Sequence, residues 1–175
     1  SHPTQILSDV FTIEEIKKKN ISKLKICWIG DYNNVLSSLI EASQKFSFQL
    51  KIGCPKKYQP KREILNKYKK LNPNLKFFDE PRNAALNSDV ILTDKVVSMN
   101  DKINKIKKLR DFKNFRVDKK LISLANKNVI LLHCLPRGKE VEEKIFKSKK
   151  SKVWIQAKNR IHVQKSILLY CMKKI

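Results

Sequence analysis

Glycine is scarce in this sequence: the 175 residues contain only Gly30, Gly53 and Gly138. No two of them lie close together. Loops that bind the phosphates of dinucleotides or nucleoside triphosphates need several glycines, because only then can backbone amides approach the phosphate. The sequence therefore excludes both kinds of loop.

Long apolar runs and paired cysteines are missing too. The longest apolar runs, such as residues 129–132, fall far short of the roughly 20 residues that cross a bilayer. Cys27, Cys54, Cys134 and Cys171 show no CxxC or other metal-ligand spacing. Cys27 and Cys171 lie in apolar patterns typical of buried small side chains. We expect a cytoplasmic protein with free thiols, no metal and no membrane partner.

Acidic residues are few, since 16 Asp and Glu stand against 39 Lys and Arg, a formal net charge of +23. Such a charge favours nucleic-acid binding, because phosphate neutralisation dominates that affinity. However, the charge is mostly lysine spread along the whole chain, whereas arginine, the better reader of phosphates and base edges, occurs six times. We interpret the charge as a lysine-rich surface and keep a basic nucleic-acid-binding α/β domain as an alternative.

Short apolar runs alternate with amphipathic segments along the chain. Most runs are continuously apolar, which is typical of strands covered on both faces. This order predicts one α/β domain with a doubly wound, mostly parallel sheet and helices on both faces. The predicted strands are Leu24–Ile29, Phe48–Gly53, Leu75–Phe78, Asp89–Thr93, Val129–His133 and Val153–Ile155.

The segments between these runs have apolar residues at helical spacing. Asn33 is expected to cap the helix that follows it. An opening helix begins at about Pro3 and continues or restarts at Thr12, where Glu15 would complete a capping box. The other predicted helices are Pro60–Leu71, Val141–Phe146 and Ile161–Met172.

Reactive side chains follow three of the predicted strands. Ligands of doubly wound sheets bind beyond the carboxyl ends of the strands, and these ends are followed by Asn33-Asn34, by Asp94 and by Cys134. Each group also has a structural interpretation, as helix caps for the first two and as a buried thiol for the third. His133 is interpreted as a satisfied core histidine. Their coincidence at one edge favours a ligand site without naming the ligand.

Two further groups are candidates for binding oxygen atoms. His2 and Gln5 lie one turn apart at a helix start, where the helix dipole favours anionic or carbonyl oxygen. Asn159 and Arg160 are expected to open the last helix, where a guanidinium would hold a carbonyl or phosphate oxygen. The structural alternatives are a helix cap for His2 and a solvated charge for Arg160.

Together these motifs resemble the second, ornithine-binding domain of the ornithine carbamoyltransferases, over nearly the whole chain. Each motif is weak alone, but the ordered set is specific. The motifs are His2-Pro3-Thr4-Gln5, Gly30-Asp31-Tyr32-Asn33-Asn34-Val35, Asp94 with Ser98-Met99, His133-Cys134-Leu135-Pro136 and Asn159-Arg160.

The resemblance implies a Rossmann-like domain that helps to transfer the carbamoyl group of carbamoyl phosphate to the side-chain amine of L-ornithine, without a cofactor. Asp94 and Cys134 would hold the amine and help it lose a proton, since an ammonium has no lone pair. Cys134 is not expected to form a covalent intermediate. By resemblance the catalytic residues are Asp94, Cys134 and Arg160. The residues expected to bind ornithine are Asn34, Asp94, Ser98 and Met99. Those expected to bind carbamoyl phosphate are His2, Gln5, Cys134, Leu135 and Arg160.

The chain departs from the family pattern at three positions, with Val96 in place of Trp, Asn100 in place of Gly and Lys158 in place of Glu. These changes concern the loop that closes over ornithine and the fine specificity. A carbamoyltransferase for another amine, such as putrescine, and a non-catalytic ligand-binding module remain alternatives.

The Ser-Thr-Arg-Thr-Arg phosphate motif of the family does not occur in these residues. We therefore expect residues 1–175 to be the ornithine-binding domain alone. The carbamoyl-phosphate-binding domain, the missing N-terminal domain, would lie outside them. The isolated chain is expected to be inactive, and the full enzyme to be a homotrimer.

Overall fold

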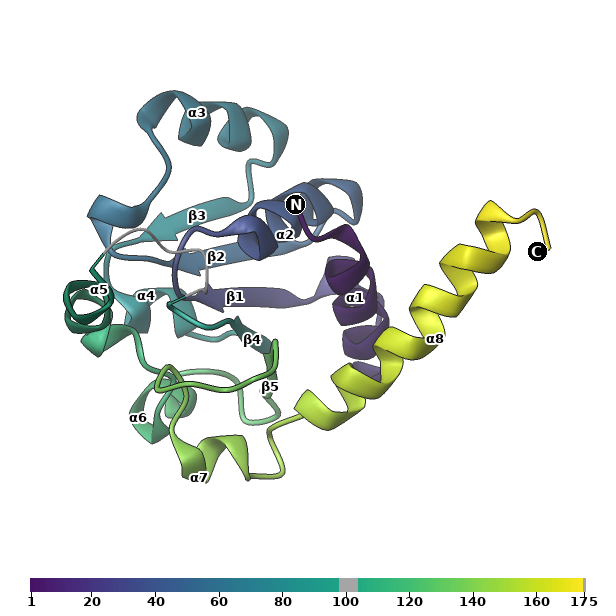
Figure 1. Cartoon of the computed structure of the whole chain (residues 1–175). Coiled ribbons are helices and arrows are strands. Elements are labelled where there is room, and N and C mark those ends of the chain that lie inside the picture. The colour runs from purple at the N-terminus through teal and green to yellow at the C-terminus, as the bar shows by residue number, and fades with distance from the viewer. Residues whose placement is uncertain (98–103, 175) are drawn as a thin grey trace.

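The computed structural model describes residues 1–97 and 104–174 of the chain. Their five strands form one parallel sheet in the order β3-β2-β1-β4-β5 (Figure 1). The predicted doubly wound parallel sheet is confirmed, and five of the six predicted strands are present to within one residue. The strands are β1 (Lys25–Ile29), β2 (Gln49–Gly53), β3 (Leu75–Phe78), β4 (Val90–Thr93) and β5 (Ile130–His133).

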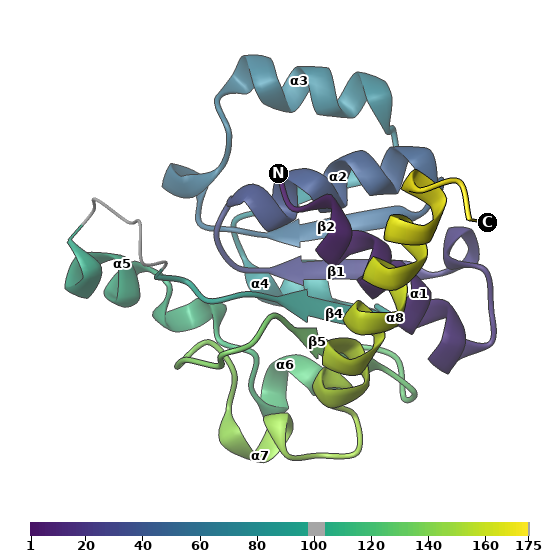
Figure 2. The ribbon, with the colours of Figure 1, turned by 45° about the vertical axis from the view of Figure 1, so that its right-hand side comes forward.

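Helices cover both faces of the sheet. α1 and α2 share one hydrophobic core with the strands, whereas α4, α6 and α7 share a second core on the opposite face. α8 packs along α1, and its C-terminal half extends beyond the sheet (Figure 1 and, turned, Figure 2). The α-helices are α1 (Pro3–Lys17), α2 (Asn34–Lys45), α3 (Arg62–Leu71), α4 (Pro81–Ala85), α5 (Lys105–Asp111), α6 (Lys119–Ser123), α7 (Glu143–Phe146) and α8 (Val153–Cys171).

Neighbouring residues of one strand enter different cores. In β1, Ile26 and Trp28 enter the core with α1 and α2, whereas Cys27 and Ile29 enter the other. This division follows from the alternation of side chains along a strand. Because both sides are buried, the strand reads in the sequence as a continuous apolar run.

Truncating Leu36 of α2 is expected to destabilise the chain strongly. Leu36 is fully buried, so Leu36→Ala removes apolar contacts and leaves a cavity, at a loss of about 3 kcal/mol of unfolding free energy. Leu168→Ala is the matched control, because Leu168 is 62% exposed on α8; it should change the value by less than about 0.5 kcal/mol. Urea denaturation measures both, and equal losses would contradict the assigned core.

The predicted strand Val153–Ile155 is wrong: these residues form the first turn of α8. Val153, Gln156 and Asn159 are the buried residues of that helix, so its contacts follow a helical period. A short apolar run cannot distinguish a strand from a buried helix start. As a consequence Asn159 and Arg160 lie inside α8, and the prediction that they open the last helix is also wrong.

The two terminal helices differ from the sequence predictions in smaller ways. α1 continues without a break through Thr12, whose hydroxyl donates to the Ser8 carbonyl oxygen at 2.7 Å, so no capping box forms there. Cys171 is exposed near the end of α8, contrary to the prediction of a buried thiol, because that half of the helix leaves the sheet. Cys27 is buried in β1 as predicted.

Candidate functional site

The site lies where the strand order of the sheet reverses. From β1 the chain builds outward through β2 and β3, then crosses back to place β4 on the other side of β1. The carboxyl ends of β1 and β4 therefore flank the crevice at which such sheets bind ligands. Gly30 directly follows β1 and has φ of +148°, a conformation that glycine adopts most readily.

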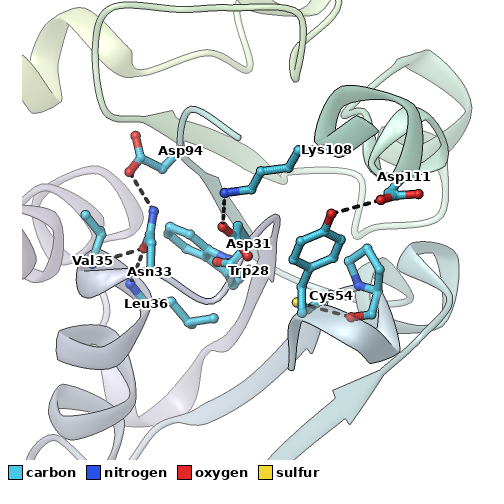
Figure 3. Close-up of polar contacts among 11 residues, drawn as sticks. Trp28, Asp31, Asn33, Val35, Leu36, Cys54, Asp94, Lys108 and Asp111 are labelled. Atoms are coloured by element: carbon cyan, nitrogen blue, oxygen red, sulfur yellow. Dashed lines mark hydrogen bonds and ion pairs between the residues drawn. The ribbon is translucent and has the colours of Figure 1, made fainter. Parts of the chain in front are cut away.

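Asn33 joins the loop after β1 to the end of β4. Its Oδ1 accepts hydrogen bonds from the backbone N–H groups of Val35 and Leu36, both at 3.0 Å, which confirms that it caps α2. Its Nδ2 donates to Asp94 Oδ2 at 3.0 Å (Figure 3). Asn34, the predicted ornithine contact, is the exposed first residue of α2.

A buried ion pair holds α5 beside the same loop. Lys108 Nζ lies 2.5 Å from Asp31 Oδ2, and the Lys108 side chain is almost fully buried (Figure 3). The Trp28 indole N–H donates to the Asp31 carbonyl oxygen at 3.2 Å. The loop after β1 is thus fixed at several points, which favours a preformed crevice.

Asp94 is half-buried directly after β4. Burial raises the pKa of its carboxyl group, while the backbone N–H of Lys95, the nearby His133 and the Asn33 amide act in the opposite direction without cancelling that rise. A carboxylate with a raised pKa binds a proton more readily. Asp94 is therefore suited to hold an ammonium group and to take its proton.

His133 ends β5 as a buried partner of Glu140. His133 Nε2 lies 2.6 Å from Glu140 Oε1, which also accepts from the Gly138 backbone N–H at 2.6 Å. Burial raises the pKa of Glu140, but these hydrogen bonds outweigh it and lower the pKa overall. The predicted core histidine is thus bonded at Nε2, whereas Nδ1 has no hydrogen-bond partner within residues 1–97 and 104–174.

Cys134 follows β5 and is partly buried. Burial raises the pKa of its thiol well above 9.0, the negative charges of Asp9 and Asp94 raise it further, and Arg160 opposes them. The group is therefore a neutral thiol at neutral pH rather than a thiolate nucleophile. The exposed Leu135 follows it, joined to Pro136 by a cis peptide bond.

Asp9 is a site residue that the sequence analysis missed. It is buried on α1, and its Oδ1 accepts from Gln5 Nε2 at 2.8 Å and from Gln156 Nε2 at 2.7 Å. Burial raises its pKa from 3.8 to about 7, although both amides and Arg160 lower it. The signal was present in the sequence, because Asp9 shares the apolar stripe of its helix with Ile6 and Ile13.

The structure brings some of the predicted site residues together and leaves others apart. Asp94, Cys134 and Arg160 act on one another or on Asp9 electrostatically, and Gln5 joins them through its hydrogen bond to Asp9. His2, whose side chain does not cap α1, instead donates its backbone N–H to Ser38 Oγ at 2.7 Å. Ser98, Met99 and Asn100 lie outside the described residues.

Among the described side chains, no group of three His, Cys, Asp or Glu residues is arranged to hold a metal ion. None of the helices in residues 1–97 and 104–174 has the length and apolar character needed to span a membrane.

The fold and site define a ligand-binding α/β domain with polar side chains gathered at the switch point of a parallel sheet. The family model for the Asp/Orn binding domain of aspartate/ornithine carbamoyltransferase matches residues 22–171. The chain belongs to this family.

The relatives found by sequence and by structure agree with this membership. The ornithine carbamoyltransferase of Methanosarcina acetivorans is 40% identical over 98% of the chain and 57% of that protein. The anabolic ornithine carbamoyltransferase of Campylobacter jejuni superposes with a TM-score of 0.89 at 36% identity, over 99% of this chain and 59% of the other. The enzyme of Pyrococcus furiosus gives 0.87 at 34% identity, over 97% and 56%. The chain thus spans less than two thirds of the length of these relatives.

Proposed function

We propose that this chain supplies the ornithine site and part of the carbamoyl site of an ornithine carbamoyltransferase. The enzyme would convert carbamoyl phosphate and L-ornithine into citrulline and phosphate. The observation that supports this most is the grouping of Asp94, a neutral Cys134 thiol and Arg160 at the carboxyl end of the sheet. The names of the relatives support the choice of ornithine.

Asp94 and Cys134 bind the side-chain amine of ornithine, which accepts the carbamoyl group. The side-chain amine of ornithine arrives as an ammonium, which has no lone pair to attack a carbonyl carbon. Asp94, with its raised pKa, takes the proton, and the Cys134 thiol lies beside the amine without forming a bond to it. Asn34, with Ser98 and Met99, would hold the amino-acid end of the substrate.

The carbamoyl group is bound by Arg160, Gln5 and His2, together with the backbone at Cys134 and Leu135. As the amine nitrogen bonds to the carbamoyl carbon, negative charge develops on the carbonyl oxygen, and preorganised donors stabilise that oxyanion. The carbon–oxygen bond to phosphate then breaks, and phosphate leaves with the electron pair. The bonded nitrogen loses its second proton to the departing phosphate, while the first proton, taken up by Asp94, passes to solvent.

Removing the Arg160 guanidinium is expected to lower kcat. Arg160→Ala deletes a donor to the developing oxyanion, and such deletions lower kcat by about 100-fold. Arg82→Ala is the control, because Arg82 lies on α4 in the opposite core layer. Steady-state citrulline assays measure kcat of both variants, each in a chain joined to the missing N-terminal domain. An Arg160 variant with the kcat of the wild type would contradict its role.

The missing N-terminal domain is proposed as the main partner. α1 and α8, with Phe46 just after α2, form an apolar groove of about 530 Å³, which supports a docking site for that domain. The relatives exceed the chain by the length of a further domain. The full enzyme is proposed to be a cytoplasmic homotrimer, and the free thiols of the chain support a reducing compartment. The residues that line the groove include Leu7, Phe11, Phe46, Val163 and Tyr170.

Complementation tests the proposed function. The joined chain is residues 1–175 fused to the part of the Methanosarcina acetivorans enzyme that they do not cover. We expect the joined chain to form citrulline and the isolated chain to form none. Citrulline formation by the isolated chain, or a joined chain that carbamoylates putrescine in preference to ornithine, would contradict the proposal. Sedimentation of the joined chain should give a trimer.

A further inference from the structure

Asp9 connects three elements beneath the site. It lies on α1 with 1% of its surface exposed. Its Oδ1 accepts from Gln5, one turn earlier on the same helix, and from Gln156 on α8. Gln156 Oε1 in turn accepts from the backbone N–H of His133 at 2.9 Å, at the end of β5. Asp9 Oδ2 is buried with no hydrogen-bond partner among the described residues.

The hydrogen bonds fix which way each amide faces. A backbone N–H only donates, so the Gln156 oxygen faces His133 and the Gln156 NH₂ group faces Asp9. Asp9 Oδ1 therefore acts as an acceptor. The Gln5 amide must also present its NH₂ group to this oxygen, because the opposite orientation would place two acceptor oxygens together. The Gln5 oxygen then points away from Asp9.

We propose that Asp9 is a positioning residue that fixes the Gln5 amide oxygen toward the carbamoyl NH₂ group of the substrate. Through Gln156, the Asp9 carboxylate is also linked by hydrogen bonds to the backbone N–H of His133, the residue before Cys134. This inference rests on the proposed function, and it adds a residue that does not itself touch the substrate.

Two charged groups and one neutral thiol surround Asp9. Arg160 lies on α8 and Asp94 at the end of β4, and the Cys134 thiol, whose pKa Asp9 raises, follows β5. Arg160 favours the charged carboxylate and Asp94 opposes it. The ionised carboxylate of Asp9 only accepts hydrogen bonds. It therefore fixes the orientation of the Gln5 and Gln156 amides more strongly than the protonated carboxyl group does.

Side-chain NMR of the 175-residue chain tests the orientation without requiring activity. The NH₂ resonances of Gln5 and Gln156 should shift together with one midpoint near pH 7, the pKa of Asp9, and this step should vanish in Asp9→Asn. Gln59 is the control, because its NH₂ group donates to the Cys54 carbonyl oxygen at 2.8 Å, outside this network. Independent titrations of Gln5 and Gln156, or a step that persists in Asp9→Asn, would overturn the inference.

A double-mutant cycle in the joined chain tests the consequence for the substrate. Asp9→Asn weakens the charge-assisted hydrogen bond to Gln5, so KM for carbamoyl phosphate should rise about tenfold while KM for ornithine stays within about twofold. In a Gln5→Met background the same change should have less than about a twofold effect. An equal effect in both backgrounds would mean that Asp9 does not act through Gln5. If the wild-type joined chain makes no citrulline, the proposed function fails, and the NMR titration alone decides the role of Asp9.

Discussion

Asp94→Asn is expected to lower kcat of the joined chain by about 100- to 10,000-fold, the usual range for loss of a general base. Asparagine keeps the hydrogen-bonding shape of the side chain but cannot take a proton from the ornithine ammonium. The fall should be largest at neutral pH, and raising the pH, which deprotonates the amine in solution, should recover part of the rate. Steady-state citrulline formation against pH measures the effect.

The matched control is Asp79→Asn, which makes the same chemical change at an exposed position after β3, a strand that β2 and β1 separate from β4 in the sheet. Its kcat should stay within about twofold of the wild-type value. Thermal unfolding of both variants separates loss of catalysis from loss of fold. If the Asp94 variant keeps more than about a third of the wild-type kcat at neutral pH, Asp94 is not the base.

Asp9 should make the stability of the chain fall as pH rises. In the unfolded chain the carboxyl ionises near its ordinary pKa of 3.8, whereas burial raises the folded value to about 7. Between these values the folded state binds more protons than the unfolded state, so unfolding free energy decreases with pH. The full contribution, present below about pH 4 and lost above about pH 7, is roughly 4 kcal/mol.

The difference between wild type and Asp9→Asn isolates this effect. The raised pKa of Asp94 gives a slope of the same sign and the lowered pKa of Glu140 gives the opposite slope, but both are shared by the two proteins. Urea denaturation from pH 4 to pH 8 should show wild type losing stability relative to the variant. Parallel curves would mean that Asp9 ionises normally in the folded chain.

The fold was largely predictable because its strands are buried on both faces. The continuous apolar runs of β4 and β5 identify them as strands. The amphipathic segments between such strands indicate helical crossovers, which join parallel strands of one sheet. The one wrong strand, Val153–Ile155, is as apolar as the true ones. Its helical state depends on packing of α8 against α1, which no local pattern contains.

Part of the candidate site was predictable because a reactive residue directly follows a strand. Asp94 and Cys134 have that position, so the sheet places both at one edge. Asp9 lies at the opposite end of the chain from Gln156, and their hydrogen bond spans residues that no spacing rule connects. The pairing of His133 with Glu140 depends likewise on the path of the loop after β5.

The most direct test of the proposed reaction follows the carbon–nitrogen bond that it forms. The joined chain would receive ornithine labelled with ¹⁵N at the side-chain amine and carbamoyl phosphate labelled with ¹³C at the carbonyl carbon. Carbamoyl transfer to the side-chain amine gives a product whose ¹³C resonance is split by the directly bonded ¹⁵N. A new bond from the carbamoyl carbon to the α-amino nitrogen of ornithine, or no such product from a folded joined chain, would contradict the proposed reaction.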